Sequence, residues 1–352
     1  MNPNQFRLRL LLDLFQLVAV PAIVLSLFLR LSHQRLGYLT APAHLAFVIA
    51  WAFAKRSILD FQRYRDAQKL YAKQIPRVVG KWPGNVDVLV KMLKAFKTAY
   101  VLDVYLELFE EYQCTTLNLY IFWADQIITM DHEHTKFVLA TGFNHFWRGY
   151  AQKERMENVL GVGIFNRDDD VWKMHRNMTR PFFARERISD FDIFERHAQR
   201  TIAILSSHSS SSKPSEAQDL YSRFTTDAAS EFLFGKNLDT LSGDLPIPGV
   251  TPMGPKGSQT RDAWGSFTGA FEMSQQIITG RSRIGWVWPL FEMFGDRSTP
   301  YVKVIRNWLD PLVGQGLKDH EATKRAGVNS PIADKTFLQH LVDSTNGEYQ
   351  FS

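Results

Sequence analysis

Cysteine is nearly absent from this chain of 352 residues, which contains only Cys114. A single thiol excludes an intrachain disulfide and a zinc site built from cysteines, and it gives no sign of an oxidising compartment. The ten histidines include no His-Glu-x-x-His spacing. The closest pair, His132 and His134, would diverge on a helix. We interpret this pair as part of a solvated helix start and predict no metal site.

A strong excess of one charge sign is also lacking. The 41 lysines and arginines outnumber the 36 aspartates and glutamates by only 5. This mild basic excess suits an anionic membrane surface but is too small for a nucleic-acid footprint, so we predict no nucleic-acid partner. Because 45% of the residues are hydrophobic, the chain can bury a sizeable core and is not disordered as a whole.

Two long apolar segments lie near the amino terminus. Residues 10–29 carry one charge, at Asp13, and as a helix would span about 30 Å, the thickness of one hydrocarbon core. Residues 36–54 carry no formal charge and could also cross or re-enter a bilayer. A cleaved signal peptide is the alternative for the first segment, but the second segment argues against it. We therefore expect a membrane anchor region over residues 1–56, with one or two spans.

The remaining residues, 57–352, are expected to form one mainly α-helical domain with a small β-sheet. Apolar spacing predicts helices over residues 59–74 and 88–111, and the prolines and glycines between them indicate a rigid connector. Alternation at residues 117–121 predicts a strand that pairs with residues 126–129. Asp131 then offers the N-cap of a helix that runs through Ala140.

Two polar segments, residues 206–216 and 242–258, are rich in serine, proline or glycine and are predicted to be solvent loops between helices. Neither is long enough to mark a domain boundary, and the sequence contains no internal repeat. These features favour a single domain after the anchor.

Residues 161–188 contain the most informative pattern. Asp168 and the two acidic residues after it predict a helix start, Trp172 and Arg176 fall four apart on one face of that helix, and Pro181 ends it. An indole N–H and a guanidinium are both hydrogen-bond donors only, so this face suits a carboxylate-bearing ligand. Taken alone, the spacing is more typical of a surface packing or cation–π pair than of a ligand site.

This stretch resembles the helix C region of the cytochromes P450, whose Trp-x-x-x-Arg motif contacts the haem propionates. The similarity extends to KWPGNVDVL, TMDHEHTKFVLATGFNHFWRG, LGVGIFNRDDDVWKMHRNMTRPFF, TTDAASEFLFGKNLDTL and TFLQHLVDST, which occur in the order seen in membrane-bound fungal members related to alkane and fatty-acid hydroxylases. It covers about residue 76 to the end of the chain. The resemblance implies the cytochrome P450 fold, which is mainly α with a small β-sheet.

By position, the resemblance assigns Trp172 and Arg176 as ligands of the haem propionates, with His175 and Arg180 nearby. It also places a loop on the substrate side of the haem pocket, although plain packing is an alternative for this loop. The loop consists of Gly161, Val162, Gly163, Ile164 and Phe165. The aromatic residues 284–294 match a region that borders the access channel, and a core role is the alternative for them.

The resemblance further implies a haem-thiolate monooxygenase that hydroxylates an apolar substrate, such as an alkane or a fatty acid. Its expected partners are O2, membrane lipid and an NADPH-dependent reductase that supplies electrons. The expected location is the endoplasmic reticulum membrane, with the soluble domain facing the cytosol.

Three patterns that complete the family's chemistry are not recognisable in this sequence. They are the Ala-Gly-x-Asp-Thr-like central helix, the Glu-x-x-Arg pair and the cysteine loop, and Cys114 stands in an unrelated context. We therefore expect a truncated, inactive chain without the axial cysteine or a catalytic residue. A membrane-anchored remnant that binds a lipid or a protein partner is the alternative.

Overall fold

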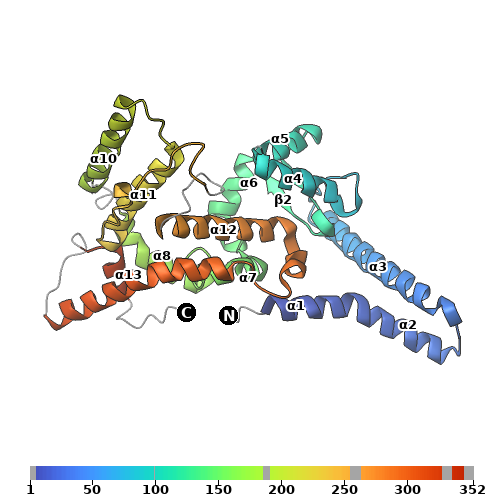
Figure 1. Ribbon diagram of the computed structural model, residues 1–352. Coiled ribbons are helices and arrows are strands. Elements are labelled where there is room, and N and C mark those ends of the chain that lie inside the picture. Colours follow the sequence, from blue (N-terminus) through green and yellow to red (C-terminus); the bar gives the residue numbers. More distant parts are fainter. Residues whose placement is uncertain (1–4, 99, 185–190, 254–262, 327–334, 345–352) are drawn as a thin grey trace. The chain divides into compact units, whose positions relative to one another are not determined.

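The computed structural model describes residues 5–98, 100–184, 191–253, 263–326 and 335–344. These residues are mainly helical, and their one sheet has two strands (Figure 1). The predicted fold class is therefore confirmed. The chain divides into two compact units: unit 1 contains residues 1–147 and 281–295, and unit 2 contains residues 148–280 and 296–352. The expected boundary at residue 56, with one domain after it, stays a prediction.

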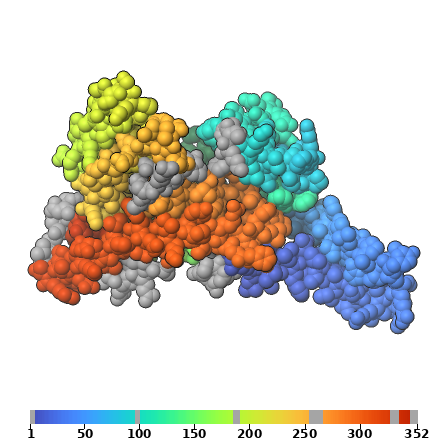
Figure 2. All heavy atoms as spheres, in the orientation of Figure 1, coloured from blue at the N-terminus to red at the C-terminus, as the bar shows by residue number. Residues whose placement is uncertain are grey.

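Unit 1 begins with the two apolar segments. The first is helical from α1 (Gln5–Leu14) through a π-helical turn (η1, Phe15–Ala19) into α2 (Val20–Leu31). A short turn, η2 (Gly37–Leu39), leads into α3 (Thr40–Lys69), which packs against α2 (blue in Figure 2). The helical stretches Gln5–Leu31 and Gly37–Lys69 are both long and apolar enough to cross a membrane, judged by length and composition.

The helix predicted over residues 59–74 is not a separate element. It is the carboxyl-terminal part of α3, which continues without a break from the second apolar segment and ends at Lys69. Residues 55–58, which separate the second apolar segment from the predicted helix, include no glycine or proline, so nothing interrupts the helical hydrogen bonds there. The helix ends where Tyr71 adopts a left-handed conformation, with φ of 51°.

The helix predicted over residues 88–111 is divided into α4 (Val86–Thr98) and α5 (Val101–Glu111), with Tyr100 in an extended conformation between them. The division lets the apolar faces of both helices pack on the same core, which one straight helix could not do. The buried members of this core are Val78, Val88, Leu89, Met92, Val104, Leu108, Phe109, Leu117, Leu119 and Ile121.

The predicted strand pair is confirmed: β1 (Thr116–Asn118) pairs antiparallel with β2 (Ile127–Thr129), and Leu117 lies opposite Ile128. The first strand ends three residues earlier than expected, because Tyr120 is left-handed, with φ of 53°. The short helical turn η4 (Ile121–Trp123) follows it.

The helix that follows the sheet starts as predicted. The Asp131 carboxylate accepts a hydrogen bond from the backbone N–H of His134 and caps α6 (His132–Lys136), after which a π-helical turn (η5, Phe137–Thr141) and the turn η6 (Phe143–His145) continue the chain. Both His132 and His134 are exposed, which confirms a solvated helix start.

The connector after α3 is fixed by hydrogen bonds. The Val78 N–H donates to the Asn118 carbonyl at 2.8 Å, and the Asn118 N–H donates to the Pro76 carbonyl at 2.8 Å. The buried Asn85 side chain, in the turn η3 (Pro83–Asn85), donates to the carbonyls of Val78 and Leu119. The proline- and glycine-containing connector is therefore ordered, as expected.

Unit 2 is helical and is organised around aromatic side chains. Its described elements are α7 (Gly149–Leu160), α8 (Asp169–Thr179), η7 (Arg180–Phe183), α10 (Phe191–Ser210), α11 (Ala217–Phe234), η8 (Thr240–Ser242), most of α12 (Ala263–Ile284), α13 (Thr299–Arg325) and α14 (Phe337–Ser344). Phe182 is fully buried and contacts the rings of Phe232 and Phe337 at centroid distances of 4.9 and 5.1 Å. His340 bonds to the Met178 carbonyl at 2.7 Å, so α8 and α14 are directly joined.

The two predicted loops are partly different from expectation. Helix α10 continues to Ser210, so the loop expected over residues 206–216 begins five residues later. In that last turn the Ser210 hydroxyl donates to the Ser206 carbonyl, which satisfies both groups within the helix. The second predicted loop follows Ser242 as expected, and its residues 254–258 lie outside the described part of the chain.

Candidate functional site

Helix α8 brings together the two residues that the sequence pattern singled out. The Arg176 guanidinium carbon lies 5.2 Å from the centroid of the Trp172 ring, within cation–π distance. Trp172 is half-buried and Arg176 is exposed. The face therefore presents a guanidinium to solvent beside a half-buried indole. This geometry fits both a cation–π pair and a carboxylate-binding face.

The start of α8 is held by Asp168, but not in the way the pattern predicted. Asp168 is at the N-cap position, and its side chain makes no capping bond to the helix. Instead, its carboxylate accepts hydrogen bonds from the backbone N–H groups of Arg148 and Gly149 at 2.9 and 3.1 Å, and it forms an ion pair with Lys153 at 3.0 Å. Asp168 thus ties the start of α8 to the start of α7.

Burial alone would raise the pKa of Asp168, but hydrogen bonds from Arg148, Lys153 and Gly149 keep the pKa below its usual value. The other end of α8 is as predicted. The helix stops at Thr179, and Pro181 lies in the following turn. Both ends of α8 are thereby fixed.

His175 lies on a different flank of α8 and is buried, with 8% of its surface exposed. Burial lowers the pKa of His175, and the positive charge of Arg167 lowers it further. The neutral imidazole is therefore favoured at neutral pH. Arg180, which was expected near the site, lies in η7 and is exposed.

His175 lines an apolar cavity of about 320 Å³ in unit 2. Three of the five predicted loop residues, Val162, Gly163 and Ile164, line the same cavity. The other two do not: the Gly161 carbonyl accepts a hydrogen bond from Asn166 at 3.1 Å, and Phe165 is 66% exposed. Trp172 and Arg176 are not among the lining residues either.

The rest of the cavity wall was missed by the sequence pattern. It comes from Leu317 on α13, from Met178 and Thr179 on α8, and from Phe337, Leu338, Leu341 and Val342 on α14. The helical apolar spacing of residues 337–342 was the available signal, but it does not reveal which element the apolar face meets.

The loop before α8 is fixed by polar contacts. The fully buried Asn166 side chain donates to the Lys153 and Gly161 carbonyls and to the Glu157 carboxylate. Arg167 adds a two-pronged ion pair with Glu157, with both N–O distances at 2.9 Å. The cavity wall at residues 162–164 is therefore anchored on α7.

The aromatic residues 284–294 of unit 1 include both buried and exposed rings. In η9 (Gly285–Glu292), Trp288 is buried and lies 4.6 Å from the Phe6 ring and 4.6 Å below the Arg281 guanidinium. Arg281 in turn pairs with the buried Glu292 at 2.6 Å. By contrast, Phe291 and Phe294 are exposed. A core role is therefore correct for Trp288 and not for the exposed rings.

Cys114 is half-buried and packs against the apolar core of unit 1. Its neighbours in this core are hydrophobic, which fits a structural thiol rather than a metal ligand.

The described residues form a mainly helical fold with one small sheet, and one helix carries the Trp-x-x-x-Arg pattern. Comparison with known families identifies the class of protein that has these features. The family model for cytochrome P450 matches residues 83–348, which is more than half of the chain. The chain therefore belongs to the cytochrome P450 family, and the resemblance seen in the sequence is confirmed.

Among curated proteins, the chain is 28% identical to cytochrome P450 monooxygenase g430 from Fusarium sp, over 84% of this chain and 51% of that protein. It is 28% identical to cytochrome P450 52-E3 from Starmerella bombicola, over 78% of this chain and 52% of that protein. It is 33% identical to cytochrome P450 52A3-A from Candida maltosa, over 74% and 47%. The chain thus spans about half the length of the curated relatives it matches.

Proposed function

We propose that this chain supplies the haem-propionate face and the membrane anchor of a haem-dependent monooxygenase. The observation that carries the proposal is the Trp172–Arg176 pair on a helix that is fixed at both ends. When bound, haem supplies the oxygen-activating chemistry, which hydroxylates an apolar substrate such as an alkane or a fatty acid. Electrons come from an NADPH-dependent reductase.

The residues fit the carboxylate end of haem. Arg176 is exposed, and among the described residues no carboxylate lies within ion-pair distance of its guanidinium. A guanidinium binds a carboxylate with two parallel hydrogen bonds, and the indole N–H of Trp172 is a further donor on the same face. Because Asp168 and Pro181 fix the ends of the helix, this face is organised before the propionates bind.

We assign no iron ligand within the described residues, because the only cysteine, Cys114, is packed in the core of unit 1. The cavity beside α8 supports a substrate-side role for the loop residues Val162, Gly163 and Ile164. His175 is buried and its pKa is lowered, so its imidazole is neutral and adds no positive charge to the cavity wall. An apolar, uncharged wall suits a hydrocarbon chain.

The two apolar helices support a membrane location, with lipid as a partner. Large apolar side chains on them are exposed, including Leu27, Phe28, Ile49 and Phe53. Transfer of these exposed side chains from water into the hydrocarbon of a bilayer is favourable. We assign the membrane as that of the endoplasmic reticulum, with the remainder of the chain facing the cytosol.

The propionate role is tested by titrating the full chain, reconstituted in lipid nanodiscs, with haem and following the Soret absorbance. We expect Arg176→Ala to weaken haem binding about tenfold, since a hydrogen bond to a charged group contributes about 1.5–3 kcal/mol. Lys173→Ala is the matched control, because Lys173 is an exposed cation on the same helix. Equal haem affinity of the two variants would overturn the assignment.

A further inference from the structure

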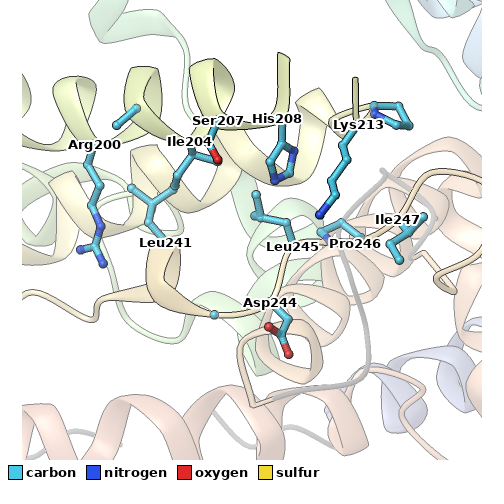
Figure 3. Close-up of a pocket in the computed structure, with 13 residues that line it drawn as sticks. Arg200, Ile204, Ser207, His208, Lys213, Leu241, Asp244, Leu245, Pro246 and Ile247 are labelled. Carbon is cyan, nitrogen blue, oxygen red and sulfur yellow. The ribbon is translucent and has the colours of Figure 1, made fainter. Parts of the chain in front are cut away.

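A groove of about 690 Å³ lies in unit 2, between α10 and the segment that follows η8 (Figure 3). On the α10 side, Arg200, Ile204 and His208 are spaced four residues apart and therefore lie on one face of the helix. Leu241 and Leu245 face them from the other side (Figure 3). The middle of the groove is thus apolar, and the basic side chains stand toward its ends.

The wall opposite α10 consists of residues 241–247, and buried polar groups of α11 hold this segment in place. Arg223 and Asp219 are paired at 2.7 Å, and both side chains are buried. Arg223 also donates to the carbonyls of Thr240 and Asp244 at 2.7 and 3.1 Å. The buried Asp227 carboxylate accepts from the backbone N–H groups of Thr240 and Leu241. The segment is thereby held on α11 without a ligand. Binding of a ligand in the groove therefore costs little backbone conformational entropy.

The charges at the two ends of the groove are not equivalent. At one end, Arg200 forms an ion pair with Asp239 and a hydrogen bond with Ser242. At the other end stand His208, whose Nδ1 is within 2.8 Å of the Ser215 hydroxyl, and the exposed Lys213. Among the described residues, no carboxylate lies within ion-pair distance of the Lys213 ammonium.

Figure 3 shows the Lys213 side chain extending toward Leu245 and Pro246, while the Asp244 carboxylate points away from the other labelled side chains. The acidic residue of the lining therefore does not neutralise the Lys213 end. The result is an apolar trough with a positive charge at one end that no carboxylate of the described residues pairs with.

We propose that this groove binds a single-chain anionic amphiphile, with its carboxylate or phosphate head at Lys213 and its alkyl chain along Ile204, Leu241 and Leu245. About 12 Å of helix separates Arg200 from His208, which gives room for a tail of medium length. A nucleic acid would need several phosphate contacts, and the groove offers one such cation. None of its lining residues belongs to α8 or to the cavity beside it, so the inference does not rest on the proposed function.

The test is photolabelling of the full chain in nanodiscs of neutral lipid, using decanoate with a diazirine on its chain and mass spectrometry to locate the label. We expect label on the peptides that contain Ile204 or residues 241–247, and displacement of the label by decanoate but not by decanol. Lys213→Glu should reduce the labelling about tenfold, whereas Lys213→Arg should retain it. Lys236→Glu is the matched control, because Lys236 is exposed in unit 2 and does not line the groove.

A second arm places the diazirine on an anionic phospholipid within the nanodisc. Label in the groove from this probe identifies the bilayer as the source of the ligand, and label from decanoate alone identifies an amphiphile from solution. Both results support the proposal. It is overturned when neither probe labels the groove, when Lys213→Glu leaves the labelling unchanged, or when decanol competes as well as decanoate. Lys213 is exposed, so circular dichroism should show the same fold in all variants.

Discussion

His175 is a buried titratable residue of the candidate site. It is buried beside apolar residues of α14, and its pKa is lowered by burial and by the charge of Arg167. A histidine with a lowered folded-state pKa binds its proton more readily in the unfolded chain. Its contribution to stability is therefore fully present above the unfolded value of about 6.5 and is lost as the pH falls below it.

We expect the free energy of unfolding of the full chain to decrease between pH 7 and pH 5.5, and His175→Leu to remove part of this decrease. The measurement is guanidinium unfolding in nanodiscs, followed by tryptophan fluorescence at several pH values. His132→Leu is the control, because His132 is exposed and should leave the pH dependence unchanged. An identical pH profile for wild type and His175→Leu would contradict the environment described for this residue.

Single residues also show what the sequence could and could not predict. Asp131 caps its helix as expected, because capping depends only on residues three positions away. Asp168 looks like the same signal, yet its carboxylate accepts hydrogen bonds from the amides of Arg148 and Gly149, which lie 20 and 19 residues earlier in the chain. The Trp172–Arg176 pair was predictable because both residues lie on one helix turn, whereas the α14 side of the cavity depends on tertiary packing.

At the scale of elements, α13 and α14 pack closely beside the cavity. Gly316 permits this contact, because a Cβ added there would overlap the side chain of Leu338. Gly314, one half-turn away on α13, has no atom within 4 Å of such a Cβ. The two glycines are thus a matched pair with different surroundings, on the same helix.

We expect Gly314→Ala to stabilise the chain by about 0.5–1 kcal/mol, since alanine is the better helix former. Gly316→Ala should instead destabilise it by about 1–3 kcal/mol, because Leu338 must leave its place in the cavity wall. Chemical unfolding of both variants measures the difference. If Gly316→Ala stabilised the chain as much as Gly314→Ala, the packing of α14 on α13 would be refuted.

Elements also explain why the bounds of two predicted helices differ from the structure, although both segments are helical over most of their length. Apolar spacing identified residues 59–74 and 88–111 as helical, but spacing reports a periodic face and not where a helix must turn. Residues 59–69 form the end of helix α3, because residues 55–58 contain no glycine or proline that would end the helix before them. The segment 88–111 is divided into α4 and α5, and the apolar faces of both helices pack on the core that contains Leu117.

At the scale of the whole molecule, the two apolar helices are the basis of the proposed membrane location. Helices α2 and α3 pack against each other and are linked by a hydrogen bond between the Ser26 hydroxyl and Nε2 of His44 at 2.9 Å. A polar contact between two helices is favoured within hydrocarbon, where water cannot replace it. This pairing favours a two-span hairpin over a single span.

We expect an Asn-x-Ser acceptor site, inserted with a flexible spacer in the turn at residues 32–36, to be glycosylated when the chain is translated into microsomes. A two-span hairpin would place this turn in the lumen while the rest of the chain remains in the cytosol. The same insertion in the exposed segment 211–213 is the control and should stay unmodified. An unmodified turn would rule out the two-span arrangement with this orientation.

The Asp227 carboxylate, which holds the groove wall on α11, also raises the free energy needed to open the turn at Thr240 and Leu241. Thr240 and Leu241 belong to a short turn outside the long helices, yet their amide protons are bound to that buried carboxylate on α11. Deuterium can replace these protons only when the turn separates from α11. These two amides should therefore exchange as slowly as the interior of α11.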